Sequence, residues 1–347
     1  MESVERVEPS MPAPQVVKRR SWWIRGSLVL LAVLVLAQLL FMWFWSYEPA
    51  AFDPLAAARQ RAAARGDKIV TGYVTTATLL ELSETLLGKR GGYISNDHLP
   101  PGLFTDDMPN WEFGVLQQLR DLALAMRNDF SRSQTQSQDV KELSEAQPLY
   151  ASPNDRWIIP STEGQYSKAN EFITSYLGKL GKSDQANVQF YARADNLENY
   201  LGLVEKQLGS LSQRLSASVA SQRQNTDLAN DKQAQQSTPG GSSITVKTPW
   251  MEIDNNFYEA RGAAYALVHI LKAVQHDFKL QIDTKNAMPS LQQIIRELEE
   301  TQAPIWSPVI LNGGGFGFFP NHSLVMANYI SRANAQIADL RALLKNG

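Results

Sequence analysis

The chain has 347 residues and a formal net charge of −2, with 33 Lys and Arg against 35 Asp and Glu, and it contains no cysteine. A chain without cysteine has no disulfide, thiolate metal site or cysteine nucleophile. Basic residues form no stripe after residue 25, so the charge pattern gives nucleic-acid binding no electrostatic support.

An apolar run near the N-terminus predicts a membrane-spanning helix. From Ser27 to Trp45 the one polar side chain after the serine is Gln38, and no residue is charged. These nineteen residues form a helix about 28 Å long, which matches a hydrocarbon core of about 30 Å. The basic and aromatic residues expected at the two membrane interfaces are Lys18, Arg19, Arg20, Trp22, Trp23, Arg25, Trp43 and Trp45.

The charges around this run predict its orientation. Basic residues precede it, whereas after it no basic residue occurs before Arg59. The positive-inside rule then places the N-terminus in the cytoplasm and exports the C-terminal part. A cleaved signal peptide is the alternative, but its apolar region normally has about 7–15 residues and ends in small ones. The longer run here ends in Phe41-Met42-Trp43-Phe44-Trp45, which favours an uncleaved signal anchor.

Changes in composition divide the chain into five expected parts. Residues 1–22 form a disordered cytoplasmic tail and 23–47 the transmembrane signal-anchor helix. Residues 48–220 form an exported helical region, and the polar stretch 221–247 forms a flexible linker or loop. Residues 248–347 form a second helical region, which we expect to pack on the first.

Apolar residues recur at helical spacing, and no segment shows sustained strand-like alternation, so the predicted fold is mainly α. The turn-rich stretch 93–109 and the proline-bounded stretch 148–160 are expected to be non-helical. Asn321-His322-Ser323 is expected to cap the last helix. The expected helices are a short stalk at 56–65, then 68–88, a helix that begins at the N-cap Asn110 and continues through the polar stretch 131–144, and helices at 165–180, 188–218, 257–278, 289–300 and 323–345.

Polar and aromatic loops supply the candidate binding residues. The loop from 97 to 112 is the best candidate for a carbohydrate-facing site, because carboxylates, a histidine and a tryptophan occur together there. A glycosidase needs two carboxylates across a cleft, which spacing along a sequence does not show, so no catalytic residue is assigned. The candidate binding residues are Asp97, His98, Asp106, Asp107, Trp111, Trp157, Phe316, Phe318 and Phe319.

Three motifs of known chemistry are incomplete. Gly181-Lys182-Ser183 resembles the end of a P-loop, but Tyr176 stands where a glycine is required and no strand precedes it. The glycine cluster at Gly313 lacks the closing glycine of a dinucleotide fingerprint; a tight loop is favoured over an anion-binding nest. His269 and His276 would lie about 10.5 Å apart along a helix axis, too far to share one zinc ion. We therefore expect no nucleotide, cofactor or metal.

Five segments after the apolar run are distinctive in combination: Tyr47-Glu48-Pro49, Gly91-Gly92-Tyr93-Ile94-Ser95-Asn96-Asp97, Asn110-Trp111-Glu112-Phe113-Gly114, Tyr191-Ala192-Arg193-Ala194-Asp195-Asn196-Leu197 and Phe318-Phe319-Pro320-Asn321-His322-Ser323. In these segments the chain resembles an uncharacterised family of proteobacterial single-pass inner-membrane proteins, known as a domain of unknown function. The resemblance covers nearly the whole chain from the apolar run onward. It implies a Gram-negative inner membrane with the main domain in the periplasm, and it brings no catalytic residues.

Two hypotheses about function follow. In the first, the protein is a non-enzymatic envelope component whose helical domain binds another envelope component. In the alternative, it is a membrane-tethered protein that binds or cleaves peptidoglycan through the loop between Asn96 and Glu112. A transporter or channel is disfavoured, because no second stretch is long and apolar enough to span a membrane; the helix at 257–278, for example, contains several charged side chains. The expected partners are the lipid bilayer, through one helix, and an envelope protein or a glycan.

Overall fold

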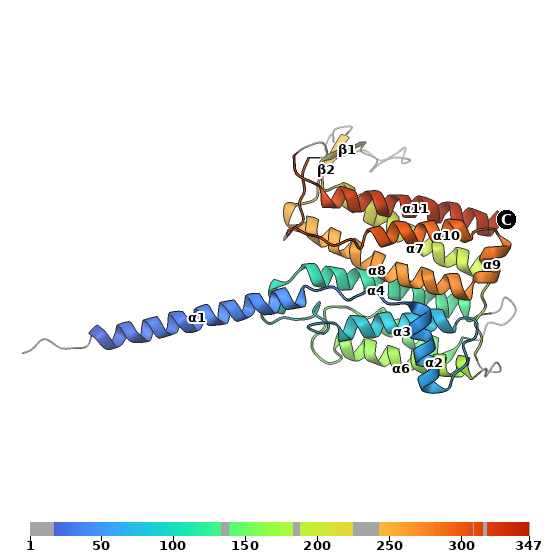
Figure 1. Ribbon diagram of the computed structural model, residues 1–347, viewed down its shortest axis with the longest axis horizontal. Coiled ribbons are helices and arrows are strands. Elements are labelled where there is room, and N and C mark those ends of the chain that lie inside the picture. Colours follow the sequence, from blue (N-terminus) through green and yellow to red (C-terminus); the bar gives the residue numbers. More distant parts are fainter. Residues whose placement is uncertain are drawn as a thin grey trace, which may run out of the picture.

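The computed structural model describes residues 17–132, 139–182, 188–224, 243–307, 309–314 and 318–346, and the side chains of 17–21, 221–224 and 243–244 are not described. The predicted mainly α fold is confirmed: one long apolar helix, α1, projects from one end of a bundle of helices (Figure 1). The elements are α1 Val17–Trp45, α2 Pro54–Arg65, α3 Tyr73–Gly88, the 3-10 turn η1 Gly102–Phe104, α4 Asp107–Ala125, the π-helical turn η2 Met126–Phe130, α5 Lys141–Tyr150, α6 Thr162–Gly181, α7 Ala194–Ser216, β1 Ser221–Gln224, β2 Ser243–Val246, the 3-10 turn η3 Trp250–Glu252, α8 Ile253–Asp277, α9 Lys279–Thr284, α10 Met288–Glu300 and α11 His322–Asn346.

Helix α8 is the centre of the bundle. Every residue from Ala260 to Leu271 is buried, so the helix is covered on all sides by its neighbours. Helices α2, α3, α4, α7, α10 and α11 all pack against it. A charged or polar residue within this stretch must therefore find its partners inside the protein.

Two glycines bring the backbones of α4 and α8 into direct contact. A Cβ atom at Gly262 would lie 2.0 Å from the carbonyl oxygen of Trp111, and one at Gly114 would lie 2.0 Å from that of Glu259. Each helix thus supplies a glycine where the other presents its main chain. Because the obstacle is backbone and not a flexible side chain, no rotamer change relieves it.

Replacement of Gly262 by Ala is expected to destabilise the fold by about 3 kcal/mol, since the added methyl group forces the two helices apart. Gly88→Ala is the matched control, because Gly88 ends α3, is exposed, and has nothing within 4 Å of a Cβ atom. The two variants and the wild-type chain are compared by denaturant unfolding followed by circular dichroism. Equal unfolding midpoints for Gly262→Ala and Gly88→Ala would contradict this picture of the contact.

The segment after α1 differs from the expected stalk. Asp53 caps α2, accepting hydrogen bonds at Oδ1 from the backbone amides of Leu55 (2.9 Å) and Ala56 (3.4 Å). Ala58 and Ala62 are buried against the bundle, so α2 packs beside α3 and does not continue α1. Burial of this alanine face is the physical reason that the stalk prediction was wrong.

Other helix boundaries also differ from the predicted ones. Helix α4 begins at Asp107, so Asn110 is not its N-cap; instead the Asn110 side chain donates to the carbonyl oxygen of Asp106 at 2.8 Å. The polar stretch 131–144 does not continue that helix, because η2 ends at Phe130 and α5 begins at Lys141. At the other end of the chain, Asn321 does cap α11 as predicted, since its Oδ1 accepts from the amide of Leu324 at 2.9 Å.

Two of the five expected parts look different in the structure. Helix α1 already begins at Val17, inside the stretch expected to be a disordered tail; residues 1–16 lie outside the described residues. At the two ends of the expected linker, β1 and β2 pair antiparallel, with Ser221 opposite Val246. Residues 225–242, between them, lie outside the described residues.

Candidate functional site

The most extensive polar network described below lies at the junction where the chain leaves α1 and meets the bundle. Residues 48–52 run in extended form from α1 toward α2 and lie along α8. Three α8 residues at intervals of four, Arg261, Tyr265 and His269, each contact this segment. Residues four apart share one face of a helix, so a single stripe of α8 holds the whole segment. We call residues 48–52 together with these three side chains the α8 junction.

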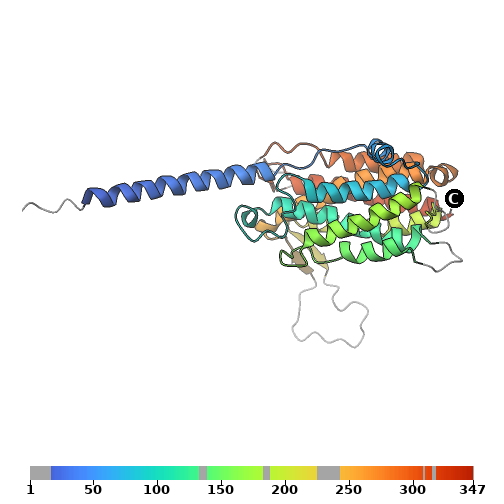
Figure 2. The same ribbon diagram turned by 90° about the horizontal axis from the view of Figure 1, so that it is seen from below.

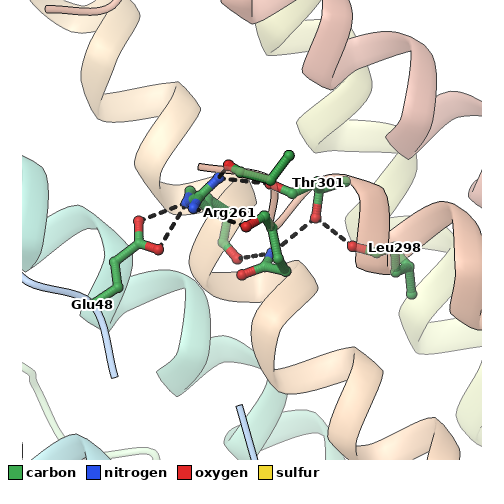
Figure 3. Close-up of polar contacts among 6 residues, drawn as sticks. Glu48, Arg261, Leu298 and Thr301 are labelled. Carbon is green, nitrogen blue, oxygen red and sulfur yellow. Dashed lines mark hydrogen bonds and ion pairs between the residues drawn. The ribbon is translucent and has the colours of Figure 1, made fainter. Parts of the chain in front are cut away.

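Arg261 makes the most contacts in the junction (Figure 3). Its Nε donates to both carboxylate oxygens of Glu48, at 2.6 and 2.9 Å. Its terminal nitrogens donate to three successive carbonyl oxygens after α10, those of Thr301 (2.8 Å), Gln302 (3.2 Å) and Ala303 (2.9 Å). The Arg261 side chain is 8 % exposed and that of Glu48 is 21 % exposed, so this charge is paired and satisfied inside the protein.

Gln302 closes the network from the other side. Its side-chain amide donates to the carbonyl oxygen of Arg261 at 3.1 Å and to the hydroxyl of Thr301 at 2.8 Å. That hydroxyl in turn donates to the carbonyl oxygen of Leu298 at the end of α10. The segment after α1, the middle of α8 and the end of α10 therefore share one hydrogen-bond network (Figure 3).

Tyr265 and His269 hold the rest of the segment. The Tyr265 hydroxyl donates to the carbonyl oxygen of Ala50 at 3.0 Å. His269 Nε2 accepts from the amide of Phe52 at 3.0 Å, while its Nδ1 lies 2.7 Å from the carbonyl oxygen of Tyr265. A neutral ring with the proton on Nδ1 satisfies both contacts. The Phe52 ring also stacks on His269, with 4.1 Å between the ring centroids.

Replacing Arg261 by Met removes the charge and leaves Glu48 and three carbonyl groups without their donor. We expect a loss of about 3 kcal/mol in unfolding free energy and faster hydrogen exchange in residues 46–55. Lys272→Met is the control, because Lys272, also on α8, pairs with Glu299 at a position where the two side chains are 39 % and 43 % exposed. A surface pair of this kind contributes about 1 kcal/mol or less. Unchanged exchange of residues 46–55 in Arg261→Met would show that the junction does not depend on this side chain.

The junction is also expected to weaken in acid. Burial lowers the pKa of His269 to about 4, from an ordinary value of 6.5. The folded state then keeps the ring neutral while the unfolded state takes up a proton, so the stability contributed by His269 is present above pH 6.5 and falls as the pH drops from 6.5 to 4.

His269→Gln keeps an acceptor for the Phe52 amide but cannot titrate. Between pH 6.5 and 4 the unfolding free energy of the wild type is expected to fall further than that of His269→Gln. The difference between the two decreases is on the order of 2 kcal/mol. His276→Gln serves as control. A hydrogen bond to Asp277 raises the pKa of His276, so its contribution has the opposite sign. Parallel pH profiles for wild type and His269→Gln, from denaturant unfolding, would refute the assignment.

A second set of contacts surrounds the end of α1. Gly91 has a φ of 83°, a conformation that glycine adopts easily, and a Cβ atom there would lie 2.8 Å from the Trp45 ring. Arg90 lies over the rings of Phe44 and Tyr47, at 5.2 and 4.8 Å from their centroids. The turn after α3 therefore supports the last turn of α1 beside the junction.

A buried ion pair fixes that turn. Lys89 Nζ lies 2.6 Å from a carboxylate oxygen of Glu112, and both side chains are almost fully buried. Glu112 also accepts from the amides of Ile94 and Ser95, each at 2.8 Å. Its carboxylate is thus fully engaged in holding the loop.

A mostly apolar cavity of about 500 Å³ lies next to the junction, between α8, α11 and the segment that joins α10 to α11. That volume is within the range of ligand sites in proteins. Arg261 belongs to both the cavity wall and the junction, and Trp306 stands in the wall with 94 % of its surface exposed. The main lining side chains are Phe257, Arg261, Ile305, Trp306, Met326 and Tyr329.

The structure brings three of the predicted binding residues together. The rings of His98 and Trp157 are 5.6 Å apart, and both residues line a shallow hollow of about 320 Å³ with Asp97 and Glu163. Asp106 lies elsewhere, in a second hollow with Trp250. The predicted residues of the 97–112 loop thus occupy separate places.

Asp107 stands in the first turn of α4 beside other acids. Burial first, and then the charges of Asp106, Asp254 and Glu48, raise the pKa of Asp107 to about 7. The carboxyl group titrates near neutrality, but no group of three or more His, Cys, Asp or Glu side chains in the described part of the chain is arranged to hold a metal ion.

One predicted site residue is corrected outright. Trp111 does not lie in a binding loop: it is fully buried within α4 and its ring packs on Tyr265, with 5.2 Å between the centroids. Phe318 and Phe319 are exposed, so these two do not fill the core. Phe316 lies outside the described residues.

The expected interface residues of α1 divide into groups. Trp22, Trp23 and Trp43 are exposed, as is Arg25, whereas Trp45 packs against the bundle. The side chains of Lys18, Arg19 and Arg20 are outside the described part of the structure.

The residues of the α8 junction were missed as a site. The predicted helix 257–278 contains Arg261, Tyr265 and His269, but His269 was considered only as a zinc ligand. The available signal was their spacing of four within a helix otherwise made of Ala, Gly and aliphatic residues. Their partners lie more than 200 positions away in sequence, so spacing alone did not reveal them.

These observations define a class: a mainly α protein with one helix, Trp22–Trp45, that is long and apolar enough to cross a membrane, the one such helix among the described residues. The chain belongs to the family described as "Uncharacterized protein conserved in bacteria (DUF2333)", whose model matches residues 16–347. Searches among curated proteins and among solved structures find no match.

Proposed function

We propose that this protein is a non-enzymatic binding component of the bacterial cell envelope. In this proposal α1 is an uncleaved signal anchor in the inner membrane, the N-terminus is cytoplasmic, and the helical domain lies in the periplasm. The cavity beside the α8 junction receives an apolar segment of another envelope protein. The single observation that carries the proposal is that Arg261 belongs at once to the cavity wall and to the network that fixes the end of α1.

The geometry of the junction favours an anchor over a cleaved signal sequence. A cleaved segment needs no fixed position on the mature domain. Here the residues directly after α1 are held by Arg261, Tyr265 and His269, and Trp45 packs against the bundle. Removal of α1 would leave a hydrogen-bonded and partly buried segment at a new chain terminus.

The distribution of polar groups favours binding over catalysis. An enzyme needs convergent groups in a pocket. Among the described residues, the carboxylate of Glu112 is engaged in an ion pair, and Asp97 and Asp106 line different hollows. The cavity of about 500 Å³ beside the junction has mostly apolar walls, which suit an apolar side chain or segment of a partner.

A photo-crosslinking amino acid at Val325 tests the proposal in intact membranes. Val325 lines the cavity and is 54 % exposed; Leu343, on the same helix, is 39 % exposed and does not line it. We expect a discrete protein adduct from position 325, none from 343, and loss of the 325 adduct when Ala303 in the cavity wall is replaced by Trp. Equal products from both positions, or an adduct that survives Ala303→Trp, would count against the cavity as the binding site.

The grouping of His98, Trp157 and Asp97 supports the second candidate, a peptidoglycan-binding protein, because aromatic and polar side chains together suit a sugar ring. On that hypothesis the full-length protein in detergent sediments with purified sacculi, and Trp157→Ala abolishes the binding. Sedimentation that is absent, or unaffected by Trp157→Ala, removes this candidate.

A further inference from the structure

The end of the bundle from which α1 projects is unusually apolar for a protein surface. Four loops form it: 95–106, 151–161, 247–252 and 303–320, the last outside its undescribed positions 308 and 315–317. Their exposed side chains include Ile159 and Trp306, each 94 % exposed, and Phe318, which is completely exposed. We call the exposed apolar residues of these loops the loop face; its members include Phe104, Ile159, Trp250, Trp306, Phe318 and Phe319.

Direct contacts join these loops into one surface. Asn96 donates to the carbonyl oxygen of Arg156 at 2.9 Å, which links the first two loops. Asp106, Trp250 and Val309 line one hollow, which links the first, third and fourth. Figures 1 and 2 show these loops at the end of the bundle where α1 joins, away from the C-terminus.

The opposite end of the bundle has a different character. Among the described residues after Tyr47, most exposed large apolar side chains belong to the four loops or to the adjoining start of α11. The others are Ile69, Leu280 and Leu343. Exposed apolar area is therefore concentrated around α1. A contiguous exposed apolar patch of this kind marks a protein or membrane contact.

The position of α1 indicates which contact it is. Ala37, Gln38, Met42 and Trp45 are partly covered, while most of the residues between them are exposed, so the bundle end covers one side of the last turns of α1. Gln38 and Trp45 are separated by about 10 Å along the helix axis. Figures 1 and 2 show the loop-bearing end of the bundle beside the last turns of α1, where Arg90 contacts Phe44 and Tyr47.

The charge of the longest loop agrees with a lipid contact. Residues 302–321 contain no Asp, Glu, Lys or Arg. Tryptophan and phenylalanine in such a segment favour the boundary between lipid headgroups and acyl chains, where binding depends on buried apolar area.

We propose that the loop face is a second membrane-binding surface, which rests in the interfacial layer of the same bilayer that α1 crosses. This inference depends on the proposed role of α1 as a membrane anchor. The domain would then contact lipid over a broad area around its anchor. Since the longest loop has no charges, apolar burial and not attraction to anionic headgroups would hold it there, and high salt would not release it.

Because the chain has no cysteine, a single introduced one reports its own position. The full-length protein carries one nitroxide-labelled cysteine at position 33, 159, 280, 306 or 318 and is reconstituted in bilayers of zwitterionic phosphatidylcholine. Collision of the label with oxygen, which concentrates in lipid, is compared with collision with a water-soluble nickel chelate. Leu280 is the matched control, because it is an apolar residue 72 % exposed at the far end of the bundle. Val33 reports on α1 itself.

We expect oxygen-to-chelate ratios several times higher at 159, 306 and 318 than at 280, and unchanged in 1 M salt. Ratios at these positions equal to that at 280, with a high ratio at 33, would overturn the loop-face proposal and leave the anchor intact. A low ratio at 33 would overturn the anchor and this inference together. Spin–spin broadening at 306 that disappears on dilution with unlabelled protein would show that the face joins two copies of the chain, which also overturns the proposal.

Discussion

One buried guanidinium group connects three distant parts of this protein. Arg261 satisfies a carboxylate in the segment after α1 and three carbonyl groups in the segment after α10, and it lines the cavity of about 500 Å³. Such a group is stable inside a protein only when all its partners stay in place. The position of α1, the end of α10 and the shape of the cavity are therefore physically linked.

The close contact between α4 and α8 supports this arrangement. Gly262 adjoins Arg261 in sequence and allows the Trp111 main chain to approach α8 directly. Trp111 then packs on Tyr265, whose hydroxyl holds Ala50. The stripe of α8 that contacts the segment after α1 is thus oriented by the packing of α4 on the adjacent side of the same helix.

The fold class could be predicted from the sequence, whereas the contacts between segments distant in sequence could not. The apolar run, the mainly α fold and most helices were recognisable, because hydrophobic spacing encodes them locally. The start of α4 was misplaced because Asp107 and Pro109, which resemble turn residues, are tolerated in the first turn of a helix. Trp111, at the predicted start of that helix, was counted with the loop before it, although it belongs to the core.

The junction and the loop face were beyond sequence reasoning for a different reason. Arg261 and Glu48 are 213 positions apart, and helical spacing gives a residue's face but not the segment that covers it. The loops of the loop face are likewise far apart along the chain, and only the fold gathers them at one end. Phe318 is an example: it is exposed because of the position of its loop in the fold, which its neighbours in sequence do not determine.

The length of the helices gives the domain a defined height. Helices α8 and α11 each have 25 residues and run from the end near α1 to the far end, where the chain also terminates (Figure 1). At 1.5 Å per residue each is about 37 Å long. The hydrogen bonds of Arg261, Tyr265 and His269 fix the segment after α1 against α8. The far end of the bundle, with the C-terminus, thus lies about 4 nm from the end that α1 joins.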